Sequence, residues 1–170
     1  MTLEELNALP ATAARDAFTR CCGASAWVGA MMARRPFASA DGMIGIAREQ
    51  WQALGPDDWR EAFAHHPQIG DLASLQAKVA STADLASREQ ASVSKATRAV
   101  LEALAEGNRA YQQRFGYIFI VFASGKGAEE MLELLKDRLG NEPVTEIGIA
   151  AGEQWKIMRR RLDQMLEAPR

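Results

Sequence analysis

Apolar residues recur every three or four positions along most of the chain, which is the spacing of amphipathic α-helices. Residues that commonly start and stop helices divide this pattern into segments. Before residue 67 we expect five helices, the last of which continues to His66. Their predicted starts or N-caps are Thr2, Pro10, Ser25, Asp41 and Pro56.

The second half of the chain predicts a long helix over residues 87–115 and two more over residues 124–140 and 143–167. The run Tyr117–Phe122 is aromatic and β-branched, as strands often are, but the chain offers no second strand to pair with it. We therefore expect an extended apolar segment packed between helices. The predicted fold is all-α, a single-domain bundle of about eight helices over residues 1–170.

The last predicted helix carries its apolar residues on one face. Arg160 lies opposite this face, whereas Arg159 and Arg161 flank it by about 80° on either side. One flanking arginine could therefore reach inward and clamp a carboxylate with two hydrogen bonds. The common alternative is a solvated basic face near a helix C-terminus. The apolar face comprises Ile147, Ala151, Trp155, Met158, Leu162 and Met165.

The only two histidines, His65 and His66, stand together where a helical pattern stops. At about 100° per residue, His66 shares the face of Trp59 and Phe63, while His65 is turned away. A half-shielded histidine at a helix end is suited to handling protons near neutral pH, because the helix end favours its charged form and burial opposes it. The alternative is a C-cap histidine bonded to a carbonyl group.

Composition excludes some classes of partner. The net charge is −2, so no global basic field favours nucleic acid or an anionic membrane. No apolar run approaches the roughly 20 residues that a membrane helix needs, and the first ten residues do not resemble a signal peptide. Cys21 and Cys22 are sequence neighbours, which disfavours a mutual disulfide, so we expect reduced thiols and a cytoplasmic protein.

A carboxylate, Glu89, lies four residues before Val93 at the edge of the long helix's buried stripe. It could face a pocket. The alternative is that Ser87 and Gln90 form a capping box and that Glu89 is favoured only by the helix dipole.

A glycine-rich loop, Ser124–Gly127, follows the apolar run but lacks the first glycine and the final hydroxyl residue of a phosphate-binding loop. We read these glycines as turn residues that lead into a helix starting near Ala128. No spacing of cysteines and histidines predicts a metal site.

Several short motifs resemble those of one family, and they occur in order from about residue 20 to 163. The family is OHCU decarboxylase, which acts on 2-oxo-4-hydroxy-4-carboxy-5-ureidoimidazoline (OHCU) in urate degradation. The motifs are Cys22-Gly23-Ala24-Ser25 with Trp27, Arg35-Pro36-Phe37, Asp58-Trp59 with Glu61-Ala62-Phe63, His66-Pro67-Gln68-Ile69-Gly70, Glu89-Gln90, Arg114-Phe115-Gly116 with Phe119, Arg138-Leu139, and Lys156-Ile157 with Arg161-Leu162.

The resemblance implies an all-helical, usually dimeric enzyme that uses no cofactor or metal and forms (S)-allantoin. The family's catalytic histidine, glutamate and arginine match His66, Glu89 and Arg161. The family's binding serine stands three residues before the glutamate, where this chain has Ala86, and Ser87 stands two before it. The further substrate-binding residues that the resemblance implies are Pro67, Ser87, Gln90, Phe119, Ile120, Val121, Phe122 and Ala123.

Two alternatives have different requirements. A non-catalytic helical interaction module would need no convergence of His66, Glu89 and Arg161, but it would need a large exposed apolar patch. A hydrolase of a related ureide or cyclic amide would need a metal cluster or an activated nucleophile, and the sequence shows neither.

Overall fold

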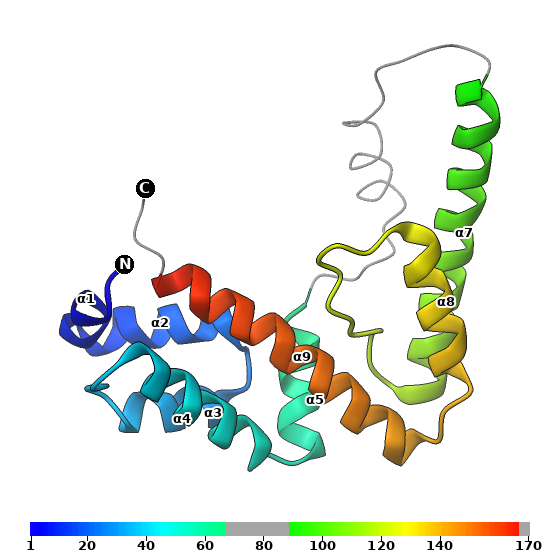
Figure 1. The fold of residues 1–170 in the computed structure, drawn as a ribbon. Coiled ribbons are helices and arrows are strands. Elements are labelled where there is room, and N and C mark those ends of the chain that lie inside the picture. The colour runs from blue at the N-terminus through cyan, green and yellow to red at the C-terminus, as the bar shows by residue number, and fades with distance from the viewer. Residues whose placement is uncertain (67–88, 167–170) are drawn as a thin grey trace. The chain divides into compact units, whose positions relative to one another are not determined.

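The computed structural model describes residues 1–66 and 89–166, and for residues 89–97 it describes the backbone only. The described part contains helices and no strand, which confirms the predicted all-α class. None of its helices is long and apolar enough to cross a lipid bilayer. The eight described helices are α1 (Leu3–Ala8), α2 (Ala11–Cys21), α3 (Ser25–Ala33), α4 (Ala40–Gln52), α5 (Pro56–Ala64), α7 (Glu89–Phe115), α8 (Ala128–Leu139) and α9 (Pro143–Leu166) (Figure 1).

The chain divides into two compact units. The first comprises Met1–His66 and Ile149–Arg170, and thus α1 to α5 with most of α9. The second comprises Pro67–Gly148, with α7, α8 and the extended segment between them. The single-domain organisation stays a prediction.

Of two predicted N-caps, Thr2 and Ser25, the structure confirms only the first. Thr2 does form a capping box with Glu5, as expected. Ser25, in contrast, is not an N-cap but the first residue of α3. Its backbone N–H donates to Glu61 Oε2 at 3.0 Å, and its hydroxyl donates to Glu61 Oε1. A carboxylate from α5 thus satisfies the start of α3, a contact between helices that local sequence patterns do not contain.

Two tryptophans form hydrogen bonds between helices of the first unit. Trp27 is fully buried and its indole N–H donates to the carbonyl of Ala47 at 3.0 Å, which joins α3 to α4. The indole N–H of Trp51 donates to the carbonyl of Ala151, also at 3.0 Å, which joins α4 to α9. These bonds satisfy the polar end of each ring inside an apolar core.

The loop after α2 lies against His65 at the end of α5. A Cβ atom added at Gly23 would lie 2.2 Å from Cγ of His65 and 2.6 Å from its Cβ. These atoms are close to the backbone of His65 and therefore cannot move away cheaply. Gly23 is required here so that the end of α5 can approach the loop.

We expect Gly23→Ala to destabilise the protein by about 1–3 kcal/mol, because the added methyl group overlaps the ring of His65. In a His65→Ala background the same substitution should cost much less. Urea unfolding of the four variants of this cycle measures the coupling between the two positions. Equal costs in both backgrounds would contradict the contact.

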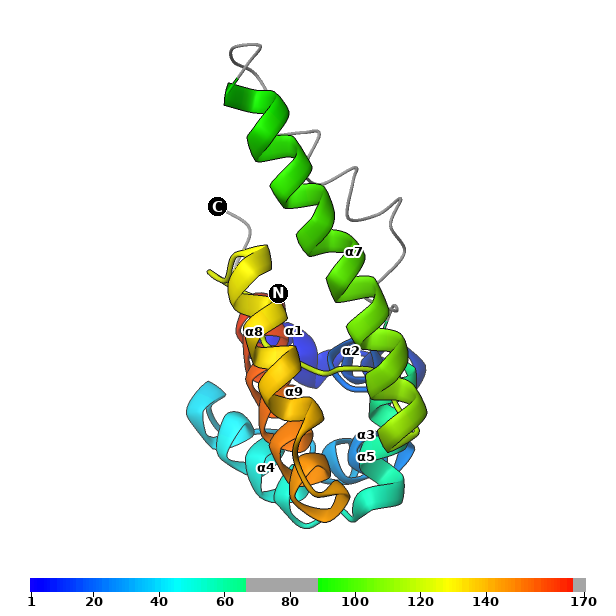
Figure 2. The ribbon, with the colours of Figure 1, turned by 90° about the vertical axis from the view of Figure 1, so that its right-hand side faces the viewer.

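In the second unit, α7 and α8 lie side by side (Figures 1 and 2). A Cβ atom at Gly107 would lie 2.6 Å from Cδ2 of Leu135, so the two helices approach closely at this point. Gly116 ends α7 in the left-handed region, with φ +80°, and its N–H donates to the carbonyl of Gln112 at 2.9 Å. This turn directs the chain back along the helix pair.

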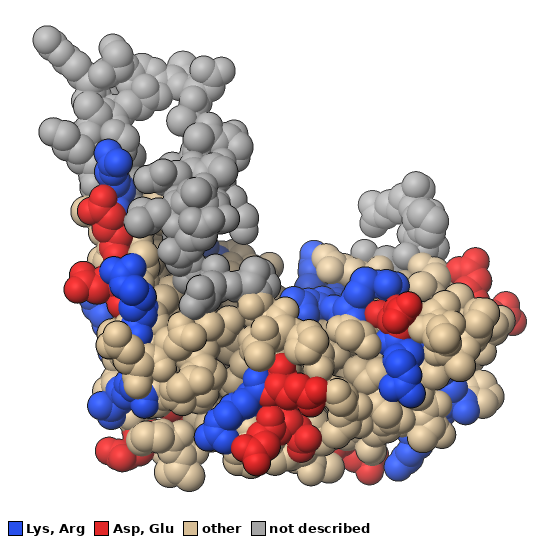
Figure 3. Space-filling view, turned by 180° about the vertical axis from the view of Figure 1, so that it is seen from behind, with Lys and Arg blue, Asp and Glu red and all other residues tan. Residues whose placement is uncertain are grey.

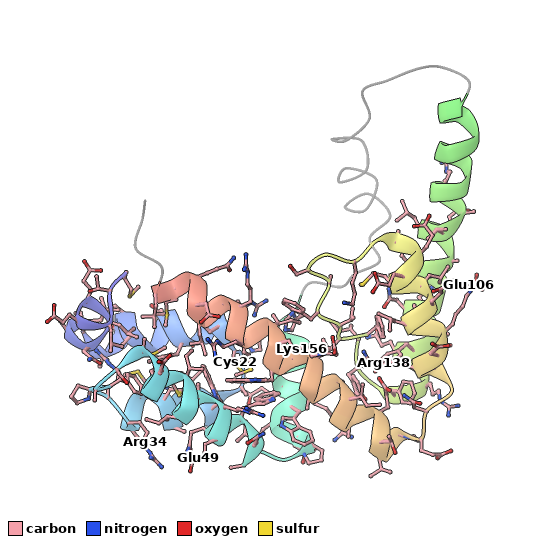
Figure 4. The ribbon with its side chains drawn as sticks, in the orientation of Figure 1. Cys22, Arg34, Glu49, Glu106, Arg138 and Lys156 are labelled. Carbon is pink, nitrogen blue, oxygen red and sulfur yellow. The ribbon has the colours of Figure 1, made fainter. Side chains whose placement is uncertain are left out.

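Residues 117–123 form neither helix nor strand, as expected of the extended segment. Arg138, labelled in Figure 4, reaches from α8 to this segment and donates through Nη1 to the carbonyl of Ile120 at 2.7 Å. Its guanidinium carbon also lies 4.6 Å from the ring centroid of Phe119. The segment is therefore held through its backbone as well as through its apolar side chains.

A buried carboxylate completes this arrangement. Glu146, which is fully buried, accepts hydrogen bonds from Nε of Arg138 at 2.8 Å, from the Tyr111 hydroxyl and from Nδ2 of Asn141 at 2.7 Å. Burial, and next the hydrogen bond to Glu146, raises the pKa of Tyr111, so its hydroxyl stays a donor. The charge of Glu146 is thus neutralised by Arg138 and bonded at both oxygens, as a buried ion pair requires.

Candidate active site

His66 follows the end of α5 in the first unit. Phe63 is fully buried, His66 is half-buried and His65 is exposed. The helical geometry predicted these orientations, and they are confirmed. The N–H of His66 donates to the carbonyl of Phe63 at 3.1 Å, which continues the last turn of the helix and fixes where the ring begins.

The ring of His66 has one close polar partner among the described residues. Its Nε2 lies 2.6 Å from Oε1 of Gln154, on α9. Burial lowers the pKa of His66 below its ordinary value, and the positive charge of Arg161 lowers it further, while the hydrogen bond to Gln154 partly opposes both effects. The ring is therefore neutral at pH 7 and able to accept a proton.

Arg161 is the flanking arginine of α9 that turns inward. It is half-buried, and its Nη1 donates to the carbonyl of Cys21 at 3.2 Å. Arg159, on the other flank, forms an exposed ion pair with Asp163 at 2.9 Å, and Arg160 is exposed. Arg161 is thus the flanking arginine that reaches inward, and its role as a carboxylate clamp stays a prediction.

Arg161 also lines a groove of about 530 Å³ within the first unit. This volume suits a small molecule. Arg20 lies in the same groove, so two guanidinium groups favour an anionic ligand there. The complete lining is Met1, Ala17, Arg20, Cys21, Arg161, Gln164 and Met165.

The two cysteines beside this groove are free and buried. Burial raises the pKa of Cys21 to about 11, although the charges of Arg161 and Arg20 lower it somewhat. Burial also raises the pKa of Cys22 to about 12. Because the thiolate is the reactive form, neither residue is a nucleophile at neutral pH. This removes the cysteines as the activated nucleophile of a hydrolase.

The predicted substrate-binding segment lies in the second unit. Phe119, Ile120 and Val121 are buried, Phe122 is half-buried and Ala123 is exposed at the following turn. The side chains of the first three face protein, so backbone groups and the side chain of Phe122 are the parts of this segment suited to meeting a ligand. The contact with Arg138 fixes the orientation of the peptide group at Ile120.

For the remaining predicted site residues, the structure describes either the backbone alone or nothing. Glu89 and Gln90 are the first two residues of α7, and only their backbone is described. Pro67 and Ser87 fall outside the described residues, as does the predicted capping box. The roles of these four residues stay predictions.

Gln154 is a residue of this site that the predicted apolar face of α9 does not include. Trp155, which that face does include, is only half-buried, whereas Gln154 is fully buried. Along the helix, Gln154 lies within about 40° of both Ile147 and Met158. A single amide at the centre of an apolar stripe is the signal that could have identified it, because a buried amide needs a polar partner.

The charged side chains on one face of the described surface are of mixed sign. On the face in Figure 3, Lys and Arg side chains are interspersed with Asp and Glu over the described surface. This agrees with the net charge of −2. Any attraction of a small anion therefore comes from local groups such as Arg161 and Arg20.

Comparisons with known proteins identify relatives of this chain. The Uric acid degradation bifunctional protein TTL of Arabidopsis thaliana is 36% identical over 151 residues, which are 88% of this chain and 46% of that protein. A 2-oxo-4-hydroxy-4-carboxy-5-ureidoimidazoline decarboxylase of Haloferax volcanii is 27% identical over 164 residues, which are 95% of this chain and 94% of that protein. The chain thus spans less than half of the first relative and nearly all of the second.

A solved structure matches over a similar length. The crystal structure of OHCU decarboxylase in the presence of (S)-allantoin has a TM-score of 0.71 and 36% identity, and the match covers 89% of this chain and 97% of that one. The family model for OHCU decarboxylase matches residues 7–163. The chain therefore belongs to the OHCU decarboxylase family.

Proposed function

We propose that this chain decarboxylates OHCU to (S)-allantoin, the last step of urate oxidation to allantoin, and that it does so without a cofactor. The observation that carries the proposal is a half-buried His66 in the first unit, whose pKa is lowered by burial and then by the charge of the inward-turned Arg161 of the same unit. A decarboxylase for this substrate needs such a proton-handling group and such a cation.

The substrate itself can take up the electron pair that decarboxylation releases. As the bond between the ring carbon and the carboxylate breaks, CO₂ leaves and the pair moves into the imidazolinone ring. A proton must then reach the neighbouring ring carbon, which bears the ureido group, from one face. The carbon that has lost the carboxylate becomes a carbonyl carbon as its hydroxyl group gives up a proton, which the neutral ring of His66 can accept. We assign the proton transfer to His66 and the binding of anionic or carbonyl oxygens to Arg161.

The other predicted residues have supporting roles in this proposal. Glu89 accepts hydrogen bonds from ureido or ring N–H groups. Pro67, Ser87, Gln90 and the backbone of Phe119–Ala123 contact the substrate. Support for the last set comes from the buried, arginine-held segment around Ile120, whose peptide groups are fixed in advance of binding.

We also propose that the enzyme acts as a cytoplasmic homodimer. The basis is the family resemblance together with the two free cysteines, which suit a reducing compartment. Sedimentation equilibrium or light scattering of the purified chain measures the assembly directly.

A helical interaction module is the less favoured function. It requires a large exposed apolar patch, whereas the large apolar side chains exposed on the described surface are Val144 and Ile149. These residues stand five positions apart on α9 and point about 140° away from each other. They do not form a patch, so the described residues lack the surface that this alternative needs.

The decisive experiment follows the stereochemistry of the product. Urate oxidase and hydroxyisourate hydrolase generate OHCU from urate in situ, the protein is added, and circular dichroism detects optically active product. In free solution the proton reaches either face, so the uncatalysed reaction gives racemic allantoin. Rapid formation of (S)-allantoin supports the proposal, and a racemic product formed at the uncatalysed rate contradicts it.

Arg161 should affect both turnover and the titration of His66. We expect Arg161→Met to lower kcat/KM by about 10²-fold, the loss typical of one charged donor in an active site. It should also raise the pKa of His66, because the guanidinium charge lowers it in the native protein. NMR titration of the ring protons measures this, with exposed His65 as the internal reference. Arg161→Lys keeps the charge and should leave the pKa of His66 nearly unchanged; an unchanged pKa in Arg161→Met would contradict the assignment.

A further inference from the structure

Gln154 lies in an unusual environment for an amide. It is fully buried on α9, one turn from Ala151 and one turn from Met158, which are also buried. An amide in such surroundings destabilises the protein unless hydrogen bonds satisfy it. Here only half of it is satisfied, because Oε1 faces His66 Nε2 at 2.6 Å while Nε2 of the amide is buried without a partner among the described residues.

Packing alone does not account for a glutamine at this position. Methionine has a similar length and volume and would fill the same space without an unpaired N–H group. The contact that methionine could not make is the hydrogen bond to the imidazole ring. We therefore expect the function of Gln154 to depend on its hydrogen bond to His66.

The chemistry of the contact restricts the ring. An amide oxygen only accepts hydrogen bonds, so the ring nitrogen that faces it, Nε2, must carry a proton. In the neutral imidazole this leaves the lone pair on Nδ1. The opposite amide orientation, with N–H facing the ring, would instead place the lone pair on Nε2 and the proton on Nδ1.

The proton-transfer cycle favours the orientation with oxygen toward the ring. When His66 accepts a proton, both ring nitrogens become donors. An amide oxygen keeps its hydrogen bond to Nε2 in the neutral and the protonated state alike. An amide N–H would face another N–H in the protonated state, so it would oppose proton uptake. Only one orientation suits a residue that must change its charge during turnover.

We propose that Gln154 is a positioning residue that holds His66 with its proton on Nε2, so that Nδ1 exchanges the proton with the substrate. The assignment of Nδ1 to proton transfer rests on the proposed function, whereas the position of the proton on Nε2 does not. Unlike a carboxylate, the neutral amide fixes the ring without adding a negative charge that would stabilise the imidazolium. The charged or titratable groups that act on the ring, Arg161 and His65, are both cations in their charged forms.

The first test needs no substrate. The chain has only two histidines, so ¹H–¹⁵N spectra that correlate ring nitrogens with ring protons give two sets of signals, and His65→Gln assigns them. We expect His66 to show a proton on Nε2 that exchanges slowly with water and an unprotonated Nδ1. A proton on Nδ1, or an Nε2 proton that exchanges as fast as that of exposed His65, would overturn the proposal.

Two variants separate positioning from packing. In Gln154→Met, the Nε2 proton of His66 should no longer exchange slowly with water. We expect kcat to fall about tenfold, because the functional histidine loses a partner that orients it, and KM to stay within about twofold. In Gln154→Glu the slow proton should remain, while the carboxylate moves the acidic limb of the pH–kcat profile to higher pH. Retention of the slow proton and of kcat in Gln154→Met would overturn the proposal.

Failure of this inference can be told apart from failure of the proposed function. A wild-type chain that forms (S)-allantoin but carries the His66 proton on Nδ1 refutes the positioning role alone. A wild-type chain with the expected Nε2 proton but no stereoselective decarboxylation refutes the proposed function, and with it the assignment of Nδ1 to proton transfer. If Gln154→Met does not fold, the wild-type spectrum still decides the tautomer.

Discussion

Replacement of His66 by asparagine should lower kcat/KM for OHCU by about 10³-fold, within the usual range for a lost general acid or base. Asparagine keeps a polar side chain of moderate size at this half-buried position but cannot exchange a proton near neutral pH. We therefore expect a folded protein with a small change in stability. Initial rates of (S)-allantoin formation, measured by circular dichroism, give the ratio directly.

The neighbouring histidine supplies a matched control. His65 has the same chemistry and lies at the same helix end, but it is exposed, and the histidine that faces Gln154 is His66. His65→Asn should leave kcat/KM within about threefold of the native value, as expected for a surface residue outside the site. If the two variants lose activity equally, or if His66→Asn keeps near-native turnover while folded, then His66 is not the proton-transfer group.

The largest effect on stability is expected at Arg138. Arg138→Met should lower the free energy of unfolding by about 3–5 kcal/mol, because it leaves the carboxylate of Glu146 buried without a counter-charge. It also removes the hydrogen bond to the Ile120 carbonyl and so releases the extended segment. Urea unfolding monitored by circular dichroism measures the loss.

Two comparisons make this prediction specific. Arg114, an exposed arginine of the same unit, donates to the Asn141 carbonyl, and Arg114→Met should cost less than about 1 kcal/mol. The double variant Arg138→Met with Glu146→Leu should be more stable than Arg138→Met alone, because it removes the uncompensated charge. A double variant whose cost equals the sum of the two single costs would contradict the account based on a buried ion pair.

Local patterns predicted the helices well because capping and periodicity are local properties. The capping box at Thr2, the proline at the start of α5 and the glycine that ends α7 all act within a few residues of themselves. The extended segment was also predictable, since a lone β-branched run in a helical chain has no strand to pair with.

Contacts between distant residues could not be predicted in the same way. Ser25 was expected to cap α3 but instead donates to Glu61, thirty-six residues later. The partner of His66 is Gln154, eighty-eight residues away, and the predicted apolar face of α9 includes its neighbour Trp155 but not Gln154 itself. The spacing of residues along a helix predicts the face on which each site residue lies. It does not predict which other helix packs against that face, because this depends on the tertiary fold.

The burial of both native thiols has a practical consequence for labelling experiments. Because Cys21 and Cys22 have pKa values of about 11 and 12, thiol-selective dyes at neutral pH will react far faster with a cysteine introduced at an exposed position. Ser124, in the turn after the extended segment, is such a position. A fluorophore placed there, in an otherwise native chain, would report ligand binding as a change in emission without prior removal of the natural cysteines.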